Sequence, residues 1–186
     1  MLLKSLLEFD LSTIGIIAQV LSLIGACFSF IAFQGRTHRA IMIFKSCDCI
    51  IFATSWFLLG NLMAGIMSVL CLVRNLIFAY LVYKNKTTLP VIIGFSVLTV
   101  GLGVGFWGGW TDLFTIIGTV LSSIAFGLKK PNHVRLCNIP VSVLWLVNDT
   151  VVTASLGGMI TEIFSIVSSV IGLIRFRPKK ELTTIK

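Results

Sequence analysis

The sequence predicts an all-α integral membrane protein with seven transmembrane helices, arranged as two parallel three-helix repeats joined by a linker helix. Three observations predict this fold. Hydrophobic residues make up 56% of the chain and charged residues only 12%, whereas soluble domains carry about 25% charged residues. The apolar residues come in runs of about 20, the length that crosses a hydrocarbon core of roughly 30 Å. The third observation is that two stretches of the chain repeat one another.

Charged residues, glycines and prolines divide the chain into seven apolar spans. The first follows Asp10 and continues well past Cys27, so we interpret it as a retained helix rather than a cleaved signal segment. The second carries Lys45 and Asp48 inside its apolar run, and the fourth is rich in glycine, which suits close helix packing in a membrane. The expected spans are 12–34, 40–58, 62–83, 90–107, 112–128, 134–153 and 158–176.

The repeat links the first and fifth spans and the third and seventh spans. "SFIAF" at 29–33 recurs as "SSIAF" at 122–126, and a basic turn with a histidine follows both. Each copy is three helices long, over 12–83 and 112–176. Because three helices reverse the direction of the chain, two copies that point the same way need one helix between them, and the span 90–107 supplies it. Such parallel repeats predict a site between the two copies near the middle of the membrane.

The basic residues give the expected orientation. Most of the 15 lysines and arginines follow the first, third, fifth and seventh spans, while "LLGN", "WGGWTD" and "SLGG" carry none. Positive residues concentrate in cytoplasmic turns, so we expect the N-terminus outside the cell and the basic tail 177–186 in the cytoplasm. The net charge of +8 then indicates membrane orientation, and no nucleic-acid partner is predicted.

The five cysteines predict neither a disulfide framework nor a metal site. All of them lie inside apolar spans, where a free cysteine behaves as a small hydrophobic residue. Cys47 and Cys49 form a Cys-x-Cys pair, but no histidine lies nearby to complete a metal site. We predict no metal and no cofactor.

Three stretches carry a family resemblance. "LLGNLMAGIMSVLCLVRNLI" (58–77), "IIGTVLSSIAF" (116–126) and "SLGGMITEIFSIVSSVIGLIRF" (155–176) resemble the YgjV-type family of bacterial inner-membrane proteins. The resemblance implies a multi-pass protein of the bacterial cytoplasmic membrane. More remotely, the three-one-three pattern resembles the SWEET, PQ-loop and PnuC transporters, although neither repeat of this chain contains a Pro-Gln pair.

Asp48 and Arg74 are the deepest charges and the first candidates for a solute path. Asp48 lies nine residues from residue 39, where the chain enters the inner face, and Arg74 lies nine residues from residue 83 at the same face. This places both about 13 Å deep. Charges at this depth usually face a cavity or a partner. We therefore predict that Asp48 and Arg74 form an ion pair. Lys45, three positions before Asp48 on the same helix, is the rival partner, although its position nearer the inner face suggests that it extends to the interface.

Other polar and aromatic residues complete the candidate set. Asn75 and Asn148 either line the path or bridge helices by hydrogen bonds. Trp145, close to Asn148, is the candidate for stacking on a solute. Trp56 and Glu162 are secondary candidates, because their positions near the outer ends of their spans suit a residue of the aromatic belt and a wet vestibule charge respectively.

The favoured function is a carrier or facilitator of a small polar solute, working by alternating access between the two repeats. Its partners would be the lipid bilayer and an unidentified solute, and a homodimer is compatible with the sequence. A non-transporting scaffold or accessory subunit is the main alternative. An intramembrane enzyme is least favoured, since the chain has no GxSxG, HExxH or GxGD motif; we predict that the protein is not an enzyme.

Overall fold

The computed structural model describes residues 13–110, 112–151 and 156–176. Every regular element in this part of the chain is an α-helix. The helices are α2 (Thr13–Gln34), α3 (His38–Leu58), α4 (Leu62–Tyr83), α5 (Leu89–Gly105), α6 (Asp112–Gly127), α7 (Pro131–Val151) and α8 (Leu156–Arg175). They match the seven expected spans within a few residues.

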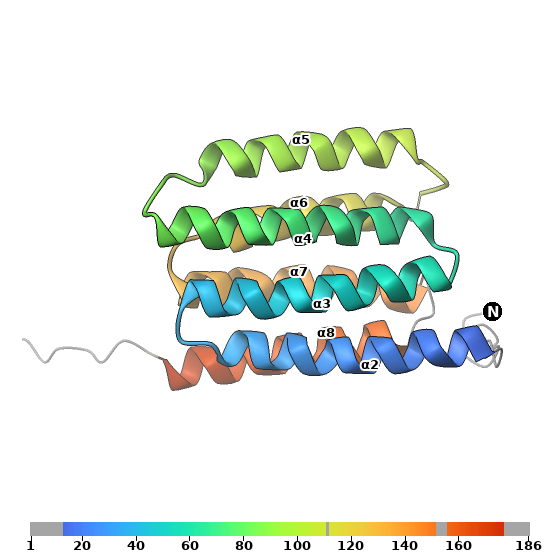
Figure 1. The fold of residues 1–186 in the computed structure, drawn as a ribbon, viewed down its shortest axis with the longest axis horizontal. Coiled ribbons are helices and arrows are strands. Elements are labelled where there is room, and N and C mark those ends of the chain that lie inside the picture. The colour runs from blue at the N-terminus through green and yellow to red at the C-terminus, as the bar shows by residue number, and fades with distance from the viewer. Residues whose placement is uncertain (1–12, 111, 152–155, 177–186) are drawn as a thin grey trace, which may run out of the picture.

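The helices form two layers with their axes roughly parallel (Figure 1). One layer contains α2, α3 and α4, the other contains α8, α7 and α6, and α5 lies at the edge beside α4 and α6. The two layers meet where α2 packs against α8, α3 against α7 and α4 against α6. The helices α3 and α7 therefore occupy the centre of the bundle.

One boundary differs from the expectation for a physical reason. The helix α7 begins at Pro131, three residues before the expected start at 134, so that Arg135 lies one turn inside it. Proline is favoured in the first turn of a helix, because its missing N–H would have no partner there. Arg135 is almost fully buried and donates from Nε to the Phe33 carbonyl at 2.9 Å.

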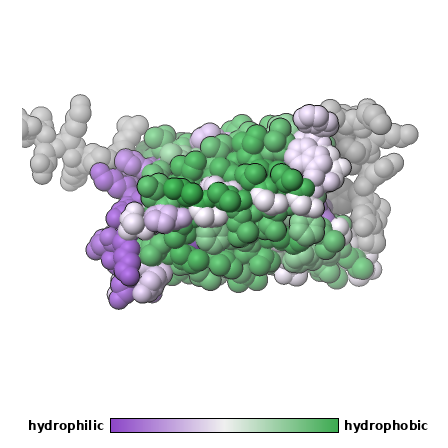
Figure 2. All heavy atoms as spheres, turned by 90° about the horizontal axis from the view of Figure 1, so that it is seen from above, coloured by the Kyte–Doolittle hydropathy of each residue, from purple (hydrophilic) through white to green (hydrophobic). Residues whose placement is uncertain are grey.

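The described helices suit a membrane. The four helices α2, α3, α4 and α8 are long and apolar enough to cross one, and α5 and α6 are shorter apolar helices of 17 and 16 residues. The surface is a green apolar band with polar groups gathered at one end (Figure 2). The interior is polar by contrast: the side chains of Ser29, Ser123, Ser168 and Ser169 are completely buried. In a membrane the apolar side chains face the lipid on the outside of the bundle. Small polar side chains inside it can then hold the helices together by hydrogen bonds.

Small residues allow close contact between helices, and short turns connect them. On α8, Gly157 has no room for a side chain, because an added Cβ would overlap the Cβ of Ser22 on α2. Gly60, with φ of 74°, makes the left-handed turn between α3 and α4. The side chain of Asn61 then caps α4 by accepting a hydrogen bond from the Ala64 amide at 3.0 Å.

An apolar core closes the bundle near its basic end. Phe33 lies near the end of α2, Ile41 near the start of α3 and Phe78 near the end of α4. All three are completely buried. Phe126 of α6 packs against them, with its ring centroid 6.5 Å from that of Phe33. We call these four residues the apolar plug. It lies next to the turns that carry Arg36, Lys84 and Lys129.

Candidate functional site

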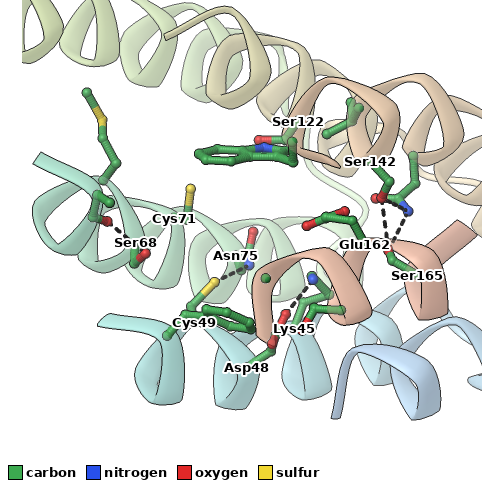
Figure 3. Close-up of a pocket in the computed structure, with 18 of the residues that line it drawn as sticks. Lys45, Asp48, Cys49, Ser68, Cys71, Asn75, Ser122, Ser142, Glu162 and Ser165 are labelled. Atoms are coloured by element: carbon green, nitrogen blue, oxygen red, sulfur yellow. Dashed lines mark hydrogen bonds and ion pairs between the residues drawn. The ribbon is translucent and has the colours of Figure 1, made fainter. Parts of the chain in front are cut away.

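A cavity of about 110 Å³ lies between α3, α4, α6, α7 and α8 (Figure 3). This volume has room for several water molecules. Phe126 lines the cavity at the apolar plug. Trp56, near the end of α3, and Gly158, near the start of α8, line it at the side away from the plug. Its ionisable carboxyl, amino and guanidinium groups belong to Lys45, Asp48, Arg74, Asp149 and Glu162. A polar, charged cavity inside an apolar bundle is the most distinctive feature of the described chain.

The two charges on α3 form an ion pair with each other. The Lys45 ammonium contacts Asp48 Oδ2 one helical turn away and donates to Ser29 Oγ at 3.0 Å. Both side chains are largely buried, with 12% and 4% of their surface exposed. Lys45 therefore points into the bundle, and the expectation that it extends to the membrane interface is wrong.

Arg74 contacts α6, and its predicted ion pair with Asp48 is wrong. From Nη1 it donates to the Thr119 carbonyl at 3.1 Å and to the hydroxyls of Ser122 and Ser123, each at 2.8 Å. Both residues line the cavity. Depth along a helix does not determine direction, however, and Arg74 is directed at α6 while Asp48 is held by Lys45.

Asn75 fills both of its expected roles. It lines the cavity and is completely buried. Its Oδ1 accepts from Arg74 Nη2 at 3.2 Å, and its Nδ2 donates to Cys49 Sγ on α3 at 3.6 Å. The amide thereby fixes the guanidinium and links α4 to α3.

The two tryptophan candidates both line the cavity. Trp145 of α7 lies against α6, since a Cβ added at Gly118 would come within 3.0 Å of its Nε1. Trp56 is buried, with 7% exposed, and packs on Phe52 with 6.5 Å between ring centroids. The assignment of Trp56 to an aromatic belt is wrong, because its side chain lies on the buried, cavity-lining side of α3.

Asn148 bridges two helices instead of facing the cavity. It is buried, with 3% exposed, and its Oδ1 accepts from Thr115 Oγ1 of α6 at 3.3 Å. Of the two roles expected for this side chain, the structure favours the bridging one.

Glu162 is part of the cavity wall, six positions into α8. Figure 3 shows its carboxylate projecting into the cavity. It lies against Ser142 and within electrostatic range of Lys45. The expected vestibule position is therefore too far out: Glu162 belongs to the same charged group as the Lys45–Asp48 pair.

A network of small polar residues between α7 and α8 was missed by the sequence analysis. Asn138 Nδ2 donates to Ser165 Oγ at 2.9 Å and to Ser142 and Ser169 Oγ, each at 3.2 Å. The available signal was the spacing of four between Asn138 and Ser142 and between Ser165 and Ser169, which places each pair on one helix face. Asn138, Ser142 and Ser165 line the cavity, so the network links α7 to α8 at one wall of it.

The described residues suit binding of an organic solute better than metal binding. No group of three His, Cys, Asp or Glu side chains in the described ranges converges on a site for a metal ion. The cavity instead combines separate charges, hydroxyls and two indole rings, the usual lining of a small-molecule site.

A family model described as "Bacterial inner membrane protein", Imp-YgjV, matches residues 16–180. No curated protein and no solved structure matches the chain. The remoter resemblance to the SWEET, PQ-loop and PnuC transporters stays a prediction.

Proposed function

Because the chain belongs to the Imp-YgjV family and is therefore a multi-pass protein of the bacterial inner membrane, we propose that it is a carrier or facilitator of a small polar solute. The observation that carries this proposal is the central cavity, with five ionisable side chains in its wall. Each charge placed in a bilayer costs roughly 2.5–3.5 kcal/mol on insertion scales. In a scaffold these charges would serve only to join helices, whereas a solute path requires polar groups in its wall.

We propose further that α2–α4 and α6–α8 are two parallel repeats joined by α5. Corresponding helices run in the same direction in Figure 1, α2 with α6, α3 with α7 and α4 with α8. The packing supports a pseudo-twofold relation between the two halves. The contact of α2 with α8 corresponds to the contact of α6 with α4, and α3 and α7 meet at the centre. The cavity lies between the halves, and alternating access would follow from rocking one against the other.

The proposed orientation places the basic end in the cytoplasm, the N-terminus outside and the C-terminus inside. The turns at this end carry Arg36, Lys84, Lys86, Lys129 and Lys130, and cytoplasmic loops carry an excess of such residues. The cavity then lies on the outer side of the apolar plug. A carrier makes and breaks no covalent bond in its solute. That the protein is not an enzyme stays a prediction.

Thiol labelling tests the proposal. Cys71 lines the cavity, whereas Cys27 of α2 is exposed on the apolar exterior. Two single-cysteine variants, each retaining one of these residues with the other four cysteines changed to alanine, form a matched pair. Both are treated with a membrane-impermeant, cationic methanethiosulfonate in right-side-out and inside-out vesicles, and residual thiols are counted by gel shift.

For a carrier, Cys71 reacts from both sides of the membrane and Cys27 reacts from neither. Reaction of Cys71 from one side only would contradict alternating access. Protection of Cys71 from both sides would contradict a hydrated cavity and favour the scaffold alternative.

A further inference from the structure

Arg74 is a buried cation without an anionic partner among the described residues. Its side chain is 2% exposed, and all of its hydrogen bonds go to neutral groups on α6 and to the amide of Asn75. At Nη2 a single acceptor, Asn75 Oδ1, is present, so one N–H of this nitrogen remains unused. Buried charges in proteins are normally paired. A guanidinium on a cavity wall with a spare donor is therefore suited to an anionic group of a ligand.

Glu162 supplies the opposite charge from another part of the wall. It is carried by α8, which packs against α2 and α7, whereas Arg74 is carried by α4, which packs against α3 and α6. The two residues therefore face the cavity from diagonally opposed helices. No ion-pair contact of Glu162 is found among the described residues. Lys45 lies within its electrostatic range, but the Lys45 ammonium contacts Asp48.

These charges discriminate between classes of solute. A simple anion would pair with Arg74 but would add its charge to those of Glu162 and Asp149, which also line the cavity. A simple cation would pair with Glu162 but would be repelled by Arg74. A molecule with one charge of each sign can pair with Arg74 and with Glu162 and leaves the Lys45–Asp48 pair undisturbed. Cavity volume limits its size, since about 110 Å³ has room for several water molecules and therefore for a solute with a similar number of non-hydrogen atoms.

The remaining wall is consistent with a small amphiphilic body. The indole rings of Trp56 and Trp145 cover one part of the cavity, and aromatic faces accept both methylene groups and ammonium groups. Hydroxyls of Ser122 and Ser142 provide hydrogen-bond partners around the charged ends.

We propose that the cavity binds a small zwitterion of the amino-acid type, with its carboxylate on Arg74 and its ammonium group on Glu162. The inference rests on the proposed carrier function and names the class of solute for the same site. The Lys45–Asp48 pair acts as a fixed dipole beside the ammonium end and makes no direct charge contact.

Binding measurements with matched probes test the inference. The full chain, purified in a mild detergent, is titrated with glycine and L-alanine as zwitterions, and with acetate and methylammonium as the separate halves, at constant ionic strength. Tryptophan fluorescence and the shift in Tm report binding. Glycine or alanine should bind at least about tenfold more tightly than either half, because both charge-assisted contacts are made together.

Charge-removing variants locate the binding. Arg74→Gln and Glu162→Gln should each weaken glycine binding about tenfold to hundredfold, and Lys86→Gln, in an exposed turn, should leave it unchanged. If Arg74→Gln does not fold, Arg74→Lys keeps the charge and loses the guanidinium fork, and it should also weaken binding.

Three results would overturn the inference: no binding of either zwitterion, equal binding of acetate or methylammonium, or glycine binding that survives both charge-removing variants. The two proposals fail separately. Labelling of Cys71 from both sides without zwitterion binding would leave the carrier and remove the solute class. Zwitterion binding with Cys71 protected would leave the binding site and remove alternating access.

Discussion

Replacing Lys45 by glutamine should destabilise the protein more than replacing its partner Asp48 by asparagine. The asymmetry follows from the surroundings of the pair. Lys45 contacts Asp48 and lies within electrostatic range of Glu162, so it retains one carboxylate when Asp48 is neutralised. Loss of Lys45 instead leaves Asp48 and Glu162 without the ammonium group that acts on both.

The magnitude follows from the burial of the pair. Removing one partner of a buried ion pair costs about 3–5 kcal/mol. At an effective dielectric constant of about 20, opposite charges attract by about 4 kcal/mol at 4 Å and by about 2 kcal/mol at 8 Å. We therefore expect a loss of about 4–5 kcal/mol for Lys45→Gln and about 2–3 kcal/mol for Asp48→Asn. The double variant should recover part of the loss, because no charge of the pair remains buried.

Unfolding in mixed micelles by titration with dodecyl sulfate, followed by tryptophan fluorescence, measures these free energies. Lys86→Gln, at an exposed position, is the matched control and should change the unfolding free energy by no more than about 0.5 kcal/mol. Equal losses for Lys45→Gln and Asp48→Asn would refute the asymmetry. A coupling energy between Asp48 and Arg74, in place of one between Asp48 and Lys45, would refute the pairing itself.

Three further predictions concern packing and orientation. Gly157→Ala should cost about 1–3 kcal/mol, because the added methyl group forces α8 away from Ser22; Gly94→Ala, which meets nothing within 4 Å, should be neutral in the same unfolding assay. Phe78→Ala should cost about 3–5 kcal/mol, since its ring is completely buried in the apolar plug, and a loss below about 1 kcal/mol would show that the plug is loosely packed. A reporter fused after Lys186 should be active only in its cytoplasmic form, and periplasmic activity would contradict the proposed orientation.

The sequence was sufficient to predict the helices, because apolar runs set their approximate bounds. Asp48, Arg74 and Asn75 all line one cavity, and their part in a solute path stays a prediction. Helix ends were the less certain part, as the early start of α7 at Pro131 shows.

Partners could not be predicted, because they depend on the rotation of each helix about its axis. Periodicity places a residue along a helix, but tertiary packing decides which neighbour it meets. Arg74 therefore meets α6 and Asn148 meets Thr115. For Trp56 the missing information was the side of α3 on which it lies, which turned an expected lipid contact into a cavity contact.

The position of the apolar plug has an electrical consequence. A wetted cavity conducts, so the voltage across an energised membrane would fall mainly over the layer formed by Phe33, Ile41, Phe78 and Phe126. Moving one elementary charge through 100 mV involves about 2.3 kcal/mol of electrical work, and a charged cargo would meet nearly all of it in this thin insulating layer. A cargo with no net charge meets none. Its flux would be indifferent to the membrane potential, and the cell could take it up or release it according to concentration alone.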